Sequence, residues 1–117
     1  MGSVKSILVV EEEYALRHTL SLILQRAGYR VTAVAEPWQI FVEFNNNLYD
    51  LLFIDVQTSE KKLASIIDEI RQDAPETRLL LLTPFDYPLP SGSDIVCLIK
   101  PVAPEQVLHA IQNESDF

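Results

Sequence analysis

Two kinds of hydrophobic pattern alternate along the 117-residue chain. Short runs of consecutive apolar residues are typical of strands that are buried on both faces of a parallel sheet. Between them lie longer stretches in which apolar residues recur every three or four positions, the spacing of an amphipathic helix. The short runs predict five strands, at residues 7–10, 29–35, 51–54, 78–82 and 94–99.

Four amphipathic helices are predicted between and after these strands. Gly28 is expected to end the first helix, because glycine readily adopts the left-handed conformation that stops helices. Pro37 and Pro104 suit the first turns of the second and last helices, where proline removes no helical hydrogen bond. The apolar stripes lie at Leu16, Leu20, Ile23, Leu24 and Ala27, at Ile40, Phe41 and Phe44, at Leu63, Ile66, Ile67 and Ile70, and at Val107, Leu108 and Ile111.

The interval 84–94, before the last strand, has no helical pattern. Prolines stand at positions 84, 88 and 90, and a glycine stands at position 92. A proline inside a helix costs about 3 kcal/mol, so prolines this dense exclude a helix. We expect residues 84–94 to form an extended, irregular loop.

Strands that alternate with helices predict an α/β fold. Parallel strands need right-handed crossovers, so a doubly wound five-stranded parallel sheet is the simplest topology. The chain shows no internal repeat, no low-complexity segment and no linker, and we expect residues 1–117 to form a single domain.

The charge and cysteine content exclude several classes of protein. Seventeen acidic residues against nine basic ones give a net charge of −8, which argues against nucleic-acid binding. Cys97 is the single cysteine, so there is no internal disulfide, and a reducing compartment is expected. The apolar run 7–10 is too short for a membrane span or a signal segment. These features predict a soluble, cytoplasmic protein without a membrane partner.

Polar residues follow four of the predicted strands directly. In doubly wound sheets, sites form at the carboxyl ends of the strands, which meet at one edge. Any one of these acids, taken singly, is more often part of a solvated loop or a helix cap. Their convergence on one edge is what favours a functional site. The residues are Glu11, Glu12 and Glu13, then Asp55, Thr83 and Lys100.

Such a cluster suits phosphoryl transfer. Clustered carboxylates repel each other unless a cation lies between them, and oxygen ligands favour Mg²⁺. A carboxylate such as that of Asp55 can then attack phosphorus and form an aspartyl-phosphate. The ammonium of Lys100 and the hydroxyl of Thr83 could stabilise the phosphoryl oxygens.

Over residues 4–115 the sequence resembles the receiver domain of two-component response regulators, which has a flavodoxin-like fold. The matching motifs are Ile7-Leu8-Val9-Val10-Glu11-Glu12-Glu13, Tyr49-Asp50-Leu51-Leu52-Phe53-Ile54-Asp55, Leu81-Leu82-Thr83 and Leu98-Ile99-Lys100-Pro101. The resemblance implies that Asp55 accepts a phosphoryl group from a histidine kinase or a phosphotransfer protein. It implies no enzymatic activity beyond self-phosphorylation and self-dephosphorylation of Asp55.

The resemblance also implies roles for the other site residues. Glu11 and Glu12 occupy the acidic-pair positions that bind Mg²⁺ together with Asp55, and Glu12 is at the more direct ligand position. The backbone carbonyl of Gln57 completes the protein ligands. Thr83 is the switch hydroxyl. Lys100 contacts the phosphoryl group, and a cis peptide bond is expected before Pro101.

Three departures from the family pattern bear on function. Both acidic-pair residues are glutamates, one methylene longer than the usual aspartate, so we expect Mg²⁺ to bind more weakly. The family's fourth helix is missing, since the proline-rich interval 84–94 takes its place. Cys97 stands where the family has a switch aromatic, and we expect it to be a small buried hydrophobic residue.

Three functions remain open. The chain is a phosphorylatable receiver, a degenerate receiver that binds proteins without phosphorylation, or a phosphohydrolase. The last is weak, because Gln57 stands where haloacid-dehalogenase-type phosphatases have a second aspartate. The retention of Asp55, Thr83 and Lys100 favours phosphorylation. We also expect the remodelled face of the fourth and fifth strands and the last helix, with Phe85, Tyr87 and Leu89, to mediate either homodimer formation or docking of a partner.

Overall fold

The computed structural model describes residues 4–55, 60–84 and 95–113. Within these residues the chain forms five strands and four helices. In chain order they are β1 (Ser6–Val10), α1 (Tyr14–Arg26), β2 (Arg30–Val34), α2 (Gln39–Asn46), β3 (Leu51–Asp55), α3 (Glu60–Asp73), β4 (Arg78–Thr83), β5 (Ile95–Ile99) and α4 (Pro104–Gln112).

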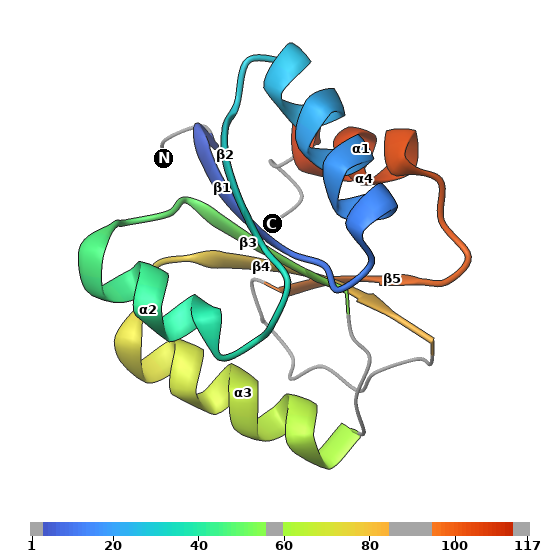
Figure 1. The fold of residues 1–117 in the computed structure, drawn as a ribbon. Helices are drawn as coiled ribbons and strands as arrows, with labels where there is room; N and C mark the ends of the chain where they lie inside the picture. The colour runs from blue at the N-terminus through green and yellow to red at the C-terminus, as the bar shows by residue number, and fades with distance from the viewer. Residues whose placement is uncertain (1–3, 56–59, 85–94, 114–117) are drawn as a thin grey trace.

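The strands form one parallel sheet in the order β2-β1-β3-β4-β5. Helices α1 and α4 cover one face of the sheet, and α2 and α3 cover the other (Figure 1). The chain starts at β1, adds β2 on one side and then adds β3, β4 and β5 on the other, so the order reverses between β1 and β3. Strand β3 lies at the centre of the sheet, next to β1. This arrangement confirms the predicted doubly wound five-stranded fold.

The core consists of two layers, one on each face of the sheet. Successive residues of a strand point to opposite faces, so each central strand contributes to both layers. Ile7 and Val9 pack toward α1 and α4, whereas Leu8 and Val10 pack toward α2 and α3. All five residues of β3 are buried. Burial on both faces explains why the strands are continuous apolar runs rather than alternating ones.

The predicted element boundaries differ from the structure by one or two residues. The second strand is Arg30–Val34 rather than 29–35, and α2 begins at Gln39. Pro37 lies in the turn before α2, where its carbonyl accepts a hydrogen bond from the Ile40 N–H. Of the proline-rich interval 84–94, only Pro84 is among the described residues. The predictions for Phe85, Tyr87 and Leu89 therefore lie outside the described residues.

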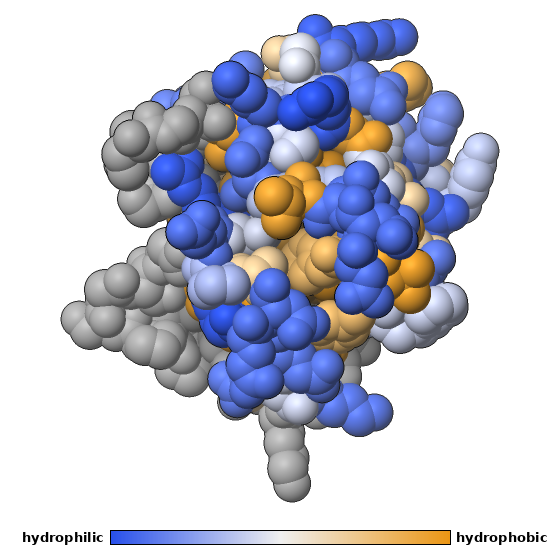
Figure 2. Space-filling view, turned by 90° about the vertical axis from the view of Figure 1, so that its left-hand side faces the viewer, coloured by the Kyte–Doolittle hydropathy of each residue, from blue (hydrophilic) through white to orange (hydrophobic). Residues whose placement is uncertain are grey.

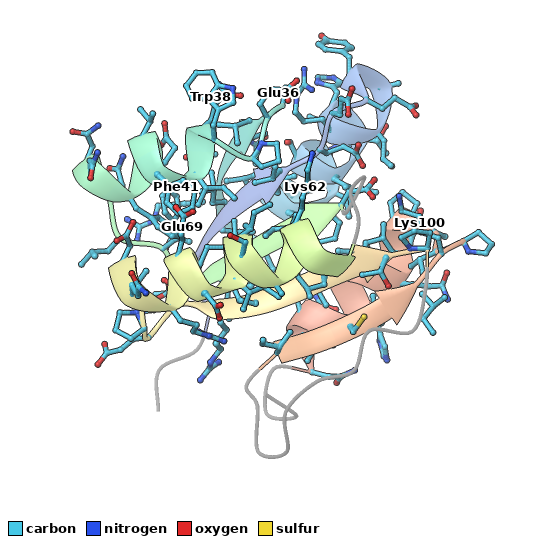
Figure 3. The ribbon with its side chains drawn as sticks, turned by 90° about the horizontal axis from the view of Figure 1, so that it is seen from below. Glu36, Trp38, Phe41, Lys62, Glu69 and Lys100 are labelled. Atoms are coloured by element: carbon cyan, nitrogen blue, oxygen red, sulfur yellow. The ribbon has the colours of Figure 1, made fainter. Side chains whose placement is uncertain are left out.

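A few large hydrophobic side chains are exposed. Seen from below, Phe41 points inward between α2 and α3, whereas Trp38 projects outward (Figure 3). Another view shows hydrophobic residues gathered at the middle of one face, within a hydrophilic surround (Figure 2). No helix among the described residues is long and apolar enough to cross a membrane.

Gly28 ends α1, as the sequence predicts. Its φ angle is +100°, a region that residues with a Cβ rarely adopt. The Tyr29 N–H donates to the Leu24 carbonyl and the Gly28 N–H to the Gln25 carbonyl, the pair of bonds that closes a Schellman motif. This turn directs the chain from α1 into β2.

Replacing Gly28 by alanine should destabilise the fold by about 1–2 kcal/mol, the cost of a left-handed conformation for a residue with a Cβ. No atom lies within 4 Å of the Cβ position, so the loss is conformational rather than steric. Urea unfolding of Gly28→Ala and Gly28→Asn would measure it. Asparagine tolerates positive φ better, so its loss should be smaller. Equal stability of wild type and Gly28→Ala would contradict the argument.

Candidate functional site

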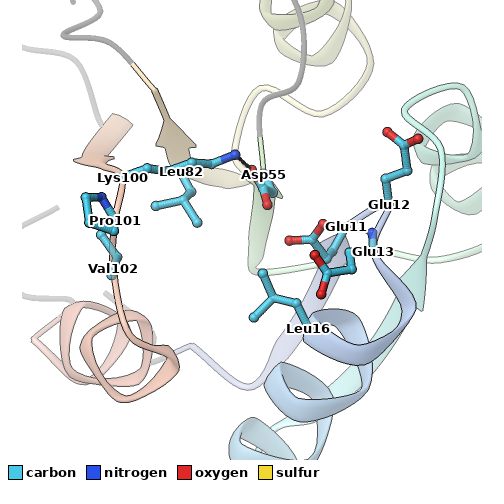
Figure 4. Close-up of a pocket in the computed structure, with 9 residues that line it drawn as sticks. All are labelled: Glu11, Glu12, Glu13, Leu16, Asp55, Leu82, Lys100, Pro101 and Val102. Atoms are coloured by element: carbon cyan, nitrogen blue, oxygen red, sulfur yellow. Dashed lines mark hydrogen bonds and ion pairs between the residues drawn. The ribbon is translucent and has the colours of Figure 1, made fainter.

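A pocket of about 610 Å³ opens at the carboxyl ends of β1, β3 and β5 (Figure 4). Strand β3 ends there in Asp55, the adjacent strand β1 is followed there by Glu11, and β5 is followed there by Lys100. Crossover connections bring these distant parts of the sequence to the same edge. The lining residues are Glu11, Glu12, Glu13, Leu16, Asp55, Leu82, Lys100, Pro101 and Val102.

Asp55 and Lys100 form an ion pair inside this pocket. Asp55 is the last residue of β3 and is only 8% exposed. Lys100 directly follows β5, and its N–H donates to the Thr83 carbonyl at 2.8 Å, which aligns it with the end of β4. The peptide bond between Lys100 and Pro101 is cis, as predicted. The structure therefore brings together the two residues on which phosphoryl chemistry would depend.

Glu11 is the acid that faces Asp55. Its side chain is 1% exposed, and its Oε2 accepts a hydrogen bond from the Glu13 N–H at 3.0 Å. Burial, helped by the interaction with the neighbouring carboxyl group of Asp55, raises the pKa of Glu11 to about 7. Its other oxygen, Oε1, is buried and meets no hydrogen-bond donor among the described residues. A proton or a cation at this oxygen would relieve the repulsion between the two carboxyl groups.

Glu12 lines the same pocket, but its side chain is exposed and its carboxylate points away from Asp55 (Figure 4). The family resemblance implies that Glu12 is at the more direct ligand position, whereas in the structure Glu11 is the acid that faces Asp55. Glu11 directly follows the buried end of β1 and is itself buried, whereas Glu12, one residue further into the loop, is exposed. Gln57, the predicted carbonyl ligand, lies outside the described residues.

The predicted metal site is therefore only partly assembled. Among the described residues, no group of three or more histidine, cysteine or acidic side chains is placed to hold a metal ion. Two carboxyl groups, those of Glu11 and Asp55, do converge. Mg²⁺ usually takes one or two carboxylates and keeps several waters, so these two residues fit its needs. The buried, unpartnered Glu11 Oε1 is the atom that such an ion would satisfy.

Thr83, which the sequence places at the same sheet edge as the acids and Lys100, does not open into the pocket. It is completely buried at the end of β4 and is not among the residues that line the pocket. Its Oγ1 lies 3.5 Å from the Cys97 Sγ. Cys97 in β5 packs against the core as a small hydrophobic residue, as predicted, although it is half-buried rather than buried. The contact forms because β4 and β5 are neighbours, which the sequence does not show directly.

Arg17 is a site residue that sequence reasoning missed. Its Nη1 donates to the carbonyls of Glu11 at 2.8 Å and of Glu12 at 3.1 Å. The available signal was an arginine one turn into the helix that follows the acids. This signal is weak, because an arginine on an amphipathic helix usually lies on the solvated face.

A flavodoxin-like sheet with an aspartate–lysine pair at its carboxyl edge defines a receiver-type module. A model of the response regulator receiver domain matches residues 7–112, and the chain belongs to this family. The alginate biosynthesis transcriptional regulatory protein AlgB of Pseudomonas aeruginosa is 25% identical over 107 residues, 86% of this chain. AlgB of Pseudomonas putida is similar to the same extent. The match covers 24% of AlgB, so the chain spans about a quarter of these curated relatives.

Solved structures of the same fold agree. The chemotaxis response regulator CheY4 of Vibrio cholerae has a TM-score of 0.78 and 23% identity, covering 96% of this chain and 99% of that one. A CheY-like receiver domain protein from Methanospirillum hungatei has a TM-score of 0.80 and 22% identity, covering 97% and 95%. These likenesses confirm the predicted fold, and the family match confirms the predicted resemblance.

Stability should fall as the pH rises from about 4.5 to 7 in the absence of Mg²⁺. The pKa of Glu11 is about 7 in the folded protein, against 4.5 for an ordinary glutamate. In this window the unfolded chain loses a proton that the folded protein keeps, so ionisation favours unfolding. The Glu11→Gln variant keeps the shape without the ionisable group, and its stability should not show this component, which is up to ~3 kcal/mol.

Urea unfolding across this pH range would measure the effect. The exposed Glu12 supplies a matched control, because Glu12→Gln removes an acid from the same loop without touching the buried one. The interpretation of Glu11 would be wrong if both variants had the same pH profile.

Proposed function

We propose that this domain accepts a phosphoryl group on Asp55 from a histidine kinase or a phosphotransfer protein. One observation carries the proposal. Asp55 is paired with Lys100 in a pocket that opens to solvent, at the edge of the sheet where acids and a lysine converge. The family of the chain supplies the class of partner. The transcriptional role named for AlgB belongs to a much longer protein and is not assigned to this chain.

The transfer follows from the residues present. A carboxylate oxygen of Asp55 attacks the phosphorus of a phosphohistidine, so an O–P bond forms and the N–P bond breaks. The departing imidazole nitrogen keeps the electron pair and takes a proton from solvent. The ammonium of Lys100, already in contact with Asp55, offsets the negative charge that gathers on the phosphoryl oxygens. The only reaction assigned to the domain is thus phosphorylation and dephosphorylation of its own Asp55.

Glu11 and Asp55 would hold the Mg²⁺ that such a reaction requires. Their two carboxyl groups meet in the pocket, and the buried Glu11 Oε1 has no donor among the described residues. The ion would neutralise charge on the phosphoryl oxygens. Glu12, on an exposed and flexible side chain, could add a ligand by rotating inward. Two glutamates in place of shorter acids support weaker binding, as the sequence suggests.

Thr83 would act as the hydroxyl that senses the phosphoryl group. Its Oγ1 now contacts the Cys97 Sγ rather than the pocket. To reach a phosphoryl oxygen the hydroxyl would have to leave this sulfur. Cys97 is much smaller than the aromatic residue that the family carries in this strand. If the Thr83 hydroxyl moved toward the phosphoryl group, only this small side chain could move into the space that it leaves. We therefore expect phosphorylation to reach β5 through a small rearrangement.

The Asp55→Asn variant should abolish labelling by radioactive acetyl phosphate or by a phosphohistidine donor. An amide nitrogen is not a nucleophile under these conditions, and the shape of the side chain is retained. Lys100→Met should slow labelling strongly, since a charge that stabilises the transition state is lost. Removal of Mg²⁺ with a chelator should stop the reaction.

Asp68 provides the matched control, because it is an exposed aspartate on α3, away from the pocket. Asp68→Asn should be labelled as fast as wild type. Equal labelling of wild type and Asp55→Asn would rule out the assignment. A folded wild type that is never labelled would favour the degenerate, phosphorylation-independent receiver instead.

A homodimer through β4, β5 and α4 remains a proposal, as does the cytoplasmic location. The four residues Ile95 to Leu98 of β5 are half-buried rather than buried, and Ile99 is 50% exposed. Exposed apolar strand residues favour an interaction surface. Light scattering should show that Ile99→Asp weakens self-association, whereas Val42→Asp on α2 does not. Val42 is a fair control because it is 48% exposed. A wild type that stays monomeric at high concentration would refute the dimer.

A further inference from the structure

Arg17 joins helix α1 to the acidic loop. The side chain is half-buried, and its Nη1 donates to two successive carbonyls, at 2.8 Å to Glu11 and 3.1 Å to Glu12. The Arg17 N–H also donates to the Glu13 carbonyl at 2.9 Å, which begins the helix. One residue therefore contacts the main chain of all three consecutive glutamates.

These contacts decide where the glutamate side chains can point. The direction of a side chain follows from the orientation of the peptides on either side of its Cα. A glutamate has one more rotatable bond than an aspartate, so a pair of glutamates depends more on a fixed main chain to present its carboxylates. Hydrogen bonds from a charged donor are stronger than those between neutral groups, so two of them restrict the orientation of these two peptides.

The guanidinium is itself held in place. It lies over the ring of Tyr14, 5.5 Å from the ring centroid. The Tyr14 ring in turn stacks on His18, with centroids 6.0 Å apart and planes inclined by 3°. A cation over an aromatic face is favoured electrostatically. In addition, the positive charge next to the loop reduces the mutual repulsion of its three glutamates.

We propose that Arg17 is a positioning residue for the metal and phosphoryl site, acting through the main chain of Glu11 and Glu12. It aligns the loop so that the Glu11 carboxyl reaches Asp55 while its Oε2 stays bonded to the Glu13 N–H. The inference rests on the proposed function, because it concerns the same pocket. It assigns Arg17 no contact with the phosphoryl group.

The test compares Arg17→Ala and Arg17→Lys with Arg26→Ala. Arg26 is an exposed arginine at the other end of α1, so Arg26→Ala changes the net charge and the helix composition in the same way as Arg17→Ala does. Titration calorimetry gives the Mg²⁺ affinity, and acetyl phosphate labelling at increasing Mg²⁺ gives the half-saturating concentration. Both are measured well below the unfolding temperature of each variant. Hydrogen exchange of the Glu13 amide, measured without metal, reports whether the Glu11 Oε2 still accepts a hydrogen bond from the Glu13 N–H.

Loss of residues that orient metal ligands typically costs 10–100-fold in affinity. We therefore expect Arg17→Ala to raise the half-saturating Mg²⁺ concentration 10–100-fold. Labelling at saturating Mg²⁺ should fall less, because Asp55 and Lys100 remain. The Glu13 amide should exchange faster. Arg17→Lys, which can reach a carbonyl with a single ammonium, should lie between wild type and Arg17→Ala. A purely structural role would lower the unfolding temperature without changing Mg²⁺ affinity.

The outcomes separate this inference from the proposed function. A labelled wild type whose Mg²⁺ affinity and Glu13 exchange are the same in Arg17→Ala and Arg26→Ala would overturn the inference alone. A wild type that neither binds Mg²⁺ nor becomes labelled would overturn both. If Arg17→Ala does not fold, Arg17→Lys decides, and wild-type affinity in that variant with normal Glu13 exchange would count against the inference.

Discussion

The close approach of the buried carboxyl groups of Glu11 and Asp55 is the constraint on which the site depends. Two such groups cannot both be ionised at short range without compensation. Lys100 supplies one positive charge, directly on Asp55. The remaining imbalance falls on Glu11, whose pKa burial raises to about 7 and whose Oε1 lacks a donor among the described residues. The pocket is thus suited to bind a cation and, beside it, an anionic phosphoryl group.

The fold creates this unfavourable contact and also makes it tolerable. Parallel pairing of β1 with β3 places Val10 beside Ile54, so the residues that follow them emerge together at the edge of the sheet. The apolar layers on both faces bury nearly all of β1, β3 and β4, and this large burial offsets the local electrostatic cost. Asp55 therefore ends a strand whose other four residues are wholly apolar. The arrangement resembles the general use of strand ends in doubly wound folds.

The chain departs from the usual receiver pattern at points that touch this pocket. Longer acids at positions 11 and 12 give the loop more freedom, and we infer that the contacts of Arg17 with its main chain restrict that freedom. A small thiol at Cys97 receives the Thr83 hydroxyl, where the family has an aromatic ring. Asp55 and Lys100 form their ion pair in the presence of both changes.

The sequence by itself determined the elements, the doubly wound parallel sheet and the convergence of Asp55 and Lys100 on one edge of it. Apolar runs and helical spacing are local properties, and parallel topology then brings strand ends to one edge. Only the tertiary structure decided that Glu11 rather than Glu12 faces Asp55, that Thr83 turns to Cys97, and that Arg17 binds the acidic loop. These outcomes depend on side-chain directions, which are set by packing between segments far apart in the chain. No local pattern in the sequence encodes these directions.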